Sequence, residues 1–170
     1  MNILIVIDMQ KDFINGSLGT KEAVKIVPNV IKKIKTYDKK NVFATMDTHS
    51  DDYLNTNEGK KLPIKHCIEN TDGWQLQEEI KLLINQKNIF KKNYFGSIEL
   101  VTNLKKIKNL EKIEIVGLCS DICVIVNAIL IKEYIKNVQI VVDKNCIAGT
   151  TKEKNEEAIS IMKSCQIDII

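Results

Sequence analysis

The chain has 170 residues, of which 44% are hydrophobic and 28% are charged, and its formal net charge at pH 7 is +3. A chain of this length and composition can bury a sizeable core, and we expect residues 1–170 to form one domain. The lysines are spread along the chain, so the charge pattern gives no electrostatic basis for binding nucleic acid or a membrane surface.

The N-terminal segment and the cysteines favour a reduced compartment. The sequence MNILIVIDMQ has a short apolar run and no basic segment before it, so we do not expect a signal peptide. No stretch approaches the roughly 18–20 apolar residues of a membrane span. The 5 cysteines are odd in number and irregularly spaced, which argues against a disulfide framework. We therefore expect a cytoplasmic protein.

Strands and helices are predicted to alternate along the chain. Residues 3–7 form a continuous apolar run, which is typical of a buried parallel strand. The predicted strands are 3–7, 41–46, 88–91, 112–116, 138–142 and 167–170, and the predicted helices are 23–36, 74–84, 98–107, 121–135 and 152–163. This order predicts a three-layer α/β/α fold with a six-stranded parallel sheet covered by helices on both faces.

Ligands of such sheets bind beyond the carboxyl ends of the strands, so polar residues that follow strands are the candidates. Asp8, Asp47, the pair Lys91 and Lys92, and the turn 117–123 each follow a predicted strand. Asp8 could instead cap a helix, and Asp12 has a stronger claim to that role. Either lysine could be an ordinary solvated charge, which is the usual state of lysine.

The segment Gly117-Leu-Cys-Ser-Asp-Ile-Cys123 ends a strand and begins a helix. In the first helical turn, free amides and the helix dipole would lower the pKa of the Cys123 thiol, and a tight turn offers N–H groups to an oxyanion. A buried structural cysteine is an equally good interpretation of the local sequence. Cys119 and Cys123 could also form a redox or metal pair, although no second pair completes a cysteine-rich site.

Residues 47–73 have no clear period and contain both histidines of the chain. A long irregular segment inside a compact domain is usually functional or disordered. Asp47 and His49 follow a strand, and Glu58 and His66 come later in the same segment. Carboxylate and imidazole together suit Zn, Mn or Fe, so a metal site and a pair of structural histidines are balanced alternatives.

Taken in order, four motifs resemble those of the isochorismatase-like cysteine hydrolases and, within them, the nicotinamidases. The motifs are Val6-Ile-Asp-Met-Gln-Lys-Asp-Phe13, then Asp47-Thr-His49 with Glu58 and residues 63–67, then Lys92-Asn-Tyr-Phe95, and finally Gly117-Leu-Cys-Ser-Asp-Ile-Cys-Val124. Each motif alone is weak, but all four in this order at predicted strand ends are specific.

The resemblance implies a catalytic triad of Asp8, Lys92 and Cys123. Asp8 would accept and return the proton, and Cys123 would form a covalent acyl-enzyme. Lys92 is preferred to Lys91 because it has the family's spacing to Phe95. The resemblance also implies an oxyanion site at the backbone N–H groups of Cys119 and Cys123, and a cis peptide bond between Leu118 and Cys119.

The resemblance further implies a divalent metal, zinc first and manganese or iron as alternatives, and a substrate pocket. The metal ligands would be Asp47, His49, Glu58 and His66, and the pocket would be lined by Phe13, Leu62, Tyr94 and Phe95. The implied activity is the hydrolysis of nicotinamide to nicotinic acid and ammonia in NAD salvage, by a homo-oligomer. Leu62 stands where many nicotinamidases have Trp or Phe, so the alternative is a relative acting on another small amide, carbamoyl or ureido compound.

Overall fold

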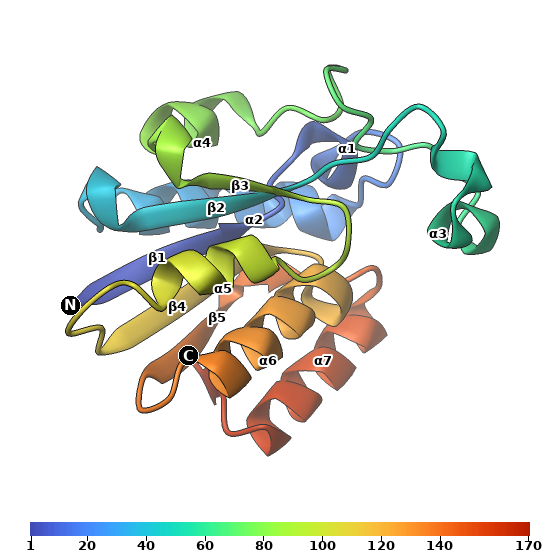
Figure 1. The fold of residues 1–170 in the computed structure, drawn as a ribbon. Helices are drawn as coiled ribbons and strands as arrows, with labels where there is room; N and C mark the ends of the chain where they lie inside the picture. The colour runs from blue at the N-terminus through green and yellow to red at the C-terminus, as the bar shows by residue number, and fades with distance from the viewer.

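Six parallel strands form the centre of the molecule in the computed structural model, which describes residues 1–170 (Figure 1). The strands are β1 (Asn2–Ile7), β2 (Val42–Asp47), β3 (Ile89–Lys92), β4 (Lys112–Leu118), β5 (Gln139–Ala148) and β6 (Asp168–Ile169). Their order in the sheet is β3-β2-β1-β4-β5-β6. The predicted six-stranded parallel sheet and α/β class are therefore confirmed.

Helices lie on both faces of this sheet, with α5, α6 and α7 on one face and α2 and α4 on the other (Figure 1). The α-helices are α1 (Lys11–Ile14), α2 (Lys21–Ile34), α3 (Asn57–Lys61), α4 (Glu78–Leu83), α5 (Ile98–Leu104), α6 (Ile125–Tyr134) and α7 (Lys152–Ser164). Short 3₁₀ helices span Lys39–Asn41, Tyr53–Asn55 and Gln86–Asn88, and a π-helical turn, η4, spans Ser120–Val124. None of the helices combines the length and apolar character that crossing a membrane requires.

The sheet separates two hydrophobic cores, because successive side chains of a strand point to opposite faces. In β1, Ile3, Ile5 and Ile7 pack toward α5, α6 and α7, whereas Leu4 and Val6 pack toward α2 and α4. All five side chains are fully buried. This explains why the first strand is a continuous apolar run instead of an alternating one.

Several predicted boundaries differ from those of the structure. The strand predicted to end at residue 142 continues to Ala148, because the charge of Asp143 is compensated by Lys33 and does not end the strand. The helix predicted over 121–135 is divided into η4 and α6, and the one predicted from residue 74 begins at Glu78. The short helix α1 and the helical turns within residues 47–73 were not predicted.

A buried ion-pair cluster joins α2 to β4 and β5 at the amino end of the sheet. Lys33 Nζ lies 2.5 Å from Glu114 Oε1 and 2.9 Å from Asp143 Oδ2, and the Tyr37 hydroxyl donates to Glu114 Oε2 at 2.7 Å. Burial opposes ionisation of Glu114, but hydrogen bonds from Lys33 and Tyr37 outweigh it and lower the pKa of this carboxyl. Lys33 thus holds two strands and a helix together through two carboxylates.

Replacing Lys33 by methionine should destabilise the fold by about 2–3 kcal/mol at pH 7, because it leaves a buried carboxylate without its main partner. The Glu114 pKa is lowered in the native state, so its contribution is present at neutral pH and is lost as the pH falls through that pKa. The difference in free energy of unfolding between Lys33→Met and the wild type, measured by urea unfolding, should therefore become smaller below about pH 4.

Lys35→Met is the matched control, since Lys35 directly follows the same helix and pairs with Glu79 with both side chains about half exposed. Its cost should stay below about 1 kcal/mol. An equal loss in both variants would show that the Lys33 cluster contributes nothing specific.

Candidate active site

The carboxyl edge of the sheet brings four predicted residues together from four neighbouring strands. In the parallel register, Asp47 at the end of β2 is paired with Lys92 at the end of β3, and Ile7 at the end of β1 is paired with Gly117 in β4. Asp8 directly follows β1, and Cys123 lies in the turn after β4. Because adjacent strands in this order are roughly 4.8 Å apart, these side chains occupy one small region.

Asp8 points into the site and does not cap a helix. Its backbone has a φ of 45°, an uncommon conformation for a residue other than glycine. The carboxylate accepts a hydrogen bond from Thr45 Oγ1 at 2.6 Å and lies 2.7 Å from Lys92 Nζ. The side chain is completely buried, and this burial raises the pKa of Asp8, which the charge of Lys92 only partly offsets.

Lys92 is the cation that the site is built around. Its Nζ lies 2.7 Å from Asp8 Oδ2, 3.2 Å from Asp47 Oδ1 and 3.4 Å from Cys123 Sγ. Burial alone would lower the pKa of this ammonium, but the charges of Asp8 and Asp47 and the hydrogen bond to Asp8 outweigh it and raise the pKa.

Lys91 points to the opposite side, pairs with Glu69 at 2.6 Å and lies over the ring of Trp74. Of the two adjacent lysines, only Lys92 is therefore in the site.

Cys123 lies in the π-helical turn η4, with only 5% of its surface exposed. Burial raises the pKa of its thiol well above the usual value, and the neighbouring carboxylate of Asp8 raises it further. The expectation that the helix N-terminus would lower this pKa is therefore wrong, because desolvation outweighs the dipole of a short turn. The thiol needs a proton acceptor beside it, and Asp8 is the carboxylate in that position.

The backbone around the cysteine turn is tightly constrained. The peptide bond between Leu118 and Cys119 is cis, as the resemblance implied. Gly117 has a φ of 121°, and a Cβ at this position would lie 2.0 Å from the carbonyl oxygen of Ile7. The carbonyl of Cys119 accepts hydrogen bonds from the N–H groups of Ile122 and Val124, whereas its own N–H has no acceptor within the chain.

Burial also raises the pKa of the Cys119 thiol, to about 12. A thiol with so high a pKa contains little thiolate at neutral pH. Burial thus opposes the thiolate form of both Cys119 and Cys123, which argues against the predicted alternative of a redox pair between them.

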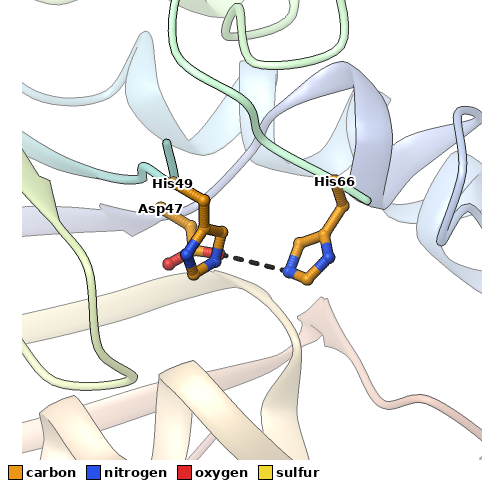
Figure 2. Close-up of side chains that lie close together, drawn as sticks. All are labelled: Asp47, His49 and His66. Atoms are coloured by element: carbon orange, nitrogen blue, oxygen red, sulfur yellow. Dashed lines mark hydrogen bonds and ion pairs between the residues drawn. The ribbon is translucent and has the colours of Figure 1, made fainter. Parts of the chain in front are cut away.

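Asp47, His49 and His66 form a second group of side chains (Figure 2), which adjoins the first through the contact of Asp47 with Lys92. One ligand atom from each lies within 4.8 Å of the others, and all three residues are buried. His49 Nε2 is 2.9 Å and His66 Nε2 is 3.6 Å from Asp47 Oδ2. Hydrogen bonds from the histidines and the charge of Lys92 overcome the effect of burial and lower the pKa of Asp47. Asp47 thus belongs to both groups.

The surroundings of these three residues fit a divalent metal. His66 Nδ1 hydrogen-bonds to the carbonyl of Ile64 at 2.8 Å, which turns Nε2 toward Asp47 in the arrangement usual for metal-bound histidines. The ring of Tyr53 packs against both imidazoles, with centroid distances of 4.7 and 4.9 Å. Glu58 Oε1 lies 3.9 Å from Nε2 of each histidine and is more exposed. Three of the four predicted ligands therefore converge, and Glu58 lies beside them.

The four residues predicted to line a substrate pocket differ in position. Phe13 is buried, with its ring 5.6 Å from that of His66. Leu62 is half-buried, and its carbonyl accepts a hydrogen bond from Tyr53. Tyr94 and Phe95 are 73% and 44% exposed in the loop between β3 and α5.

The sequence interpretation missed two buried residues that hold the site in place. The Gln10 amide donates to the carbonyls of Asp47 and Trp74 at 2.8 Å and accepts from the Asp47 N–H at 2.7 Å. Thr45 Oγ1 holds the Asp8 carboxylate. Thr45 is a polar residue in the middle of an apolar strand, which was the available signal, whereas Gln10 stands between Met9 and Lys11 and gave none. Asp12 accepts a hydrogen bond from the N–H of Cys67 and so fixes the loop that carries His66.

Solved structures of nicotinamidases and pyrazinamidases have the same fold. The pyrazinamidase of Pyrococcus horikoshii in complex with zinc is 25% identical, with a TM-score of 0.81 and coverage of 99% of this chain and 98% of that one. The nicotinamidase of Bacillus subtilis is 26% identical with a TM-score of 0.80 and the same coverage. The pyrazinamidase/nicotinamidase of Streptococcus mutans is 26% identical, with a TM-score of 0.83 over 100% of both chains.

A comparison with curated protein sequences found no match. A family model, described as the isochorismatase domain, matches residues 2–170. This match covers nearly the whole chain and agrees with the fold and with the order of the four motifs, and so this protein belongs to the isochorismatase family.

Proposed function

We propose that this protein is a metal-dependent nicotinamidase, which hydrolyses nicotinamide to nicotinic acid and ammonia through a thioester on Cys123. The observation that carries the proposal is the position of the Lys92 ammonium, which contacts the Asp8 carboxylate and the Cys123 sulfur at the same time. Nicotinic acid would then enter NAD salvage in the cytoplasm.

Family and fold support the general class of reaction. The isochorismatase family and the nicotinamidase and pyrazinamidase neighbours indicate a hydrolase of amide bonds. The substrate of this chain and its metal are inferred from the site.

The first step would be proton transfer from Cys123 to Asp8. Burial raises the pKa of the Cys123 thiol, so it needs a proton acceptor, and burial also raises the pKa of the Asp8 carboxylate, which makes Asp8 a stronger base for this proton. Lys92, 3.4 Å from the sulfur, would stabilise the thiolate as the proton leaves. The thiolate would then attack the amide carbon.

The later steps would return the same proton. The negative charge on the carbonyl oxygen would be stabilised by backbone N–H groups of the cysteine turn, including that of Cys119, which is free to donate. Asp8 would give its proton to the leaving nitrogen, so that ammonia departs and a thioester remains on Cys123. Water, deprotonated by Asp8, would then attack the thioester carbon. The C–S bond breaks, the carboxylic acid leaves, and Asp8 returns the proton to the Cys123 sulfur.

Asp47, His49 and His66 would hold the divalent metal, with Glu58 beside them. When bound, a metal ion supplies a Lewis acid that can anchor the ring nitrogen of a pyridine amide. Zinc is the first choice for this nitrogen and oxygen donor set, with manganese and iron as alternatives. The zinc complex of the Pyrococcus neighbour supports a divalent metal at such a fold.

Leu62 favours a second candidate function, the hydrolysis of another small amide, carbamoyl or ureido compound. It occupies the position next to the proline of the metal loop, where an aromatic ring was expected from the resemblance. The two candidates share one mechanism, and they differ in whether a pyridine ring is required.

Purified protein supplied with zinc, manganese or iron should release ammonia from nicotinamide, and Cys123→Ala should lower the rate by more than about a thousandfold. Cys165→Ala is the matched control, because Cys165 is a partly buried cysteine far from the site at the end of α7, and it should retain full activity.

The two candidate functions are separated by comparing the rates of ammonia release from nicotinamide and from carbamoyl and ureido compounds in the presence of each metal. Faster turnover of a carbamoyl or ureido compound would favour the second, and no turnover of any amide would exclude both.

Lys92→Met should remove activity and destabilise the fold by about 3 kcal/mol, because it leaves Asp8 and Asp47 buried without their shared cation. The adjacent Lys91→Met should retain activity and change the free energy of unfolding by less than about 1 kcal/mol, since Lys91 forms an exposed pair with Glu69. Urea unfolding and ammonia release measure both effects. If Lys92→Met keeps its activity, the lysine has no catalytic role.

Dialysis against a chelator should abolish activity, and added zinc, manganese or iron should restore it. His66→Ala should weaken metal binding by more than about a hundredfold. Loss of a residue that only hydrogen-bonds to a metal ligand costs about 10–100-fold in affinity, and this substitution removes a proposed ligand itself. Asp51→Asn changes an exposed carboxylate of the same segment, paired only with Lys65, and should bind metal normally. Metal content measured by mass spectrometry checks both variants, and full metal occupancy in His66→Ala would contradict the assignment.

A further inference from the structure

Asn127 is a buried polar residue that the proposed chemistry does not use. It lies in α6, where every neighbour in the segment Ile-Val-Asn-Ala-Ile-Leu-Ile is hydrophobic, and its exposed fraction is 0%. An amide in such surroundings loses its hydrogen bonds to water, so it is tolerated only where protein groups replace them. The partners of Asn127 therefore indicate its role.

The Asn127 side chain makes three hydrogen bonds, which join two segments of the site. Nδ2 donates to the carbonyl of Cys123 at 2.7 Å and to the carbonyl of Phe95 at 2.9 Å. Oδ1 accepts from the N–H of Ser97 at 2.9 Å. One amide thus connects the turn that carries the nucleophile to the loop that directly follows Lys92.

This loop, residues 93–97, has few other attachments to the site. In its remaining hydrogen bonds, Ser97 accepts from the N–H groups of Leu100 and Val101 in the first turn of α5. Gly96 lies so close to α6 that an added Cβ would be 3.0 Å from Val126, which brings the loop within reach of Asn127. Without the Asn127 amide, the loop would be held to the Cys123 turn only by packing and by the contact of Lys92 with the sulfur.

We propose that Asn127 is a positioning residue, which fixes the Cys123 turn against the 93–97 loop and so sets the separation of Cys123 Sγ and Lys92 Nζ. This inference rests on the proposed function for the roles of Cys123 and Lys92. A shift of about 1 Å in such a pair can cost on the order of a hundredfold in rate, so a residue that touches no substrate can still control turnover.

Two substitutions separate positioning from general stability. Asn127→Asp keeps the acceptor for Ser97 but replaces the donor with an oxygen that faces the carbonyls of Cys123 and Phe95. Asn127→Leu has a similar shape and removes all three hydrogen bonds. Asn88→Leu is the matched control, because Asn88 is also buried and also donates to two backbone carbonyls, those of Lys40 and Val42, but at the amino end of β3.

Positioning predicts that kcat for nicotinamide falls at least about tenfold in both Asn127 variants, whereas Asn88→Leu keeps the wild-type kcat even if it loses as much stability. Urea unfolding measures the stability of each variant, and assays are run where all remain folded. Unchanged kcat in the Asn127 variants would overturn the inference. If Asn127→Leu does not fold, Asn127→Asp provides the same comparison.

Hydrogen exchange tests the positioning role of Asn127 independently of whether the proposed function is correct. If the wild type hydrolyses no amide, the proposed function fails, and the inference is decided by exchange of the peptides that cover residues 93–98 and 119–124. Faster exchange of both peptides in Asn127→Leu, but not in Asn88→Leu, supports the connection. Unchanged exchange overturns it.

Discussion

The site depends on one buried positive charge, the ammonium of Lys92. Two carboxylates and a thiol surround it, and without a cation at this point Asp8 and Asp47 would be two desolvated negative charges side by side. The same ammonium connects the two halves of the site, because Asp8 belongs to the proposed proton-transfer pair and Asp47 to the candidate metal site. A single side chain therefore couples the charge state of Cys123 to that of Asp47 and the candidate metal site.

Buried amides and hydroxyls surround this charge and fix the main chain around it. Gln10 pairs with both backbone groups of Asp47, Thr45 holds the Asp8 carboxylate, and Asn127 connects the cysteine turn to the loop after β3. Each of the three satisfies its hydrogen bonds with protein groups, as buried polar residues require. The positions of the charged side chains thus depend on neutral residues that take no part in the proposed proton transfer.

The sequence predicts the sheet and the sites at its carboxyl edge, because apolar strands and the polar residues after them are local features of the chain, whereas the choice of Lys92 over Lys91 came from the family resemblance. It does not predict the direction in which the pKa of Cys123 shifts, since both the burial of the thiol and the nearby charge of Asp8 come from residues that are distant in sequence. The sequence also did not predict how far β5 extends. Lys33, which compensates the charge of Asp143 inside this strand, comes from α2, a distant part of the chain. Glu58 looked equivalent to the other metal ligands, and only its three-dimensional position distinguishes it.

The register between β1 and β4 has a consequence for how the protein gains its activity. Ile7 and Gly117 are paired although they come from distant parts of the chain; Asp8 directly follows β1, and Cys123 lies in the turn after β4. Contacts between distant segments form late and slowly, because their loop-closure entropy must be overcome first. A partly folded chain with its local helices formed would have no active site, so recovery of turnover after dilution from denaturant reports the final assembly of the central strands.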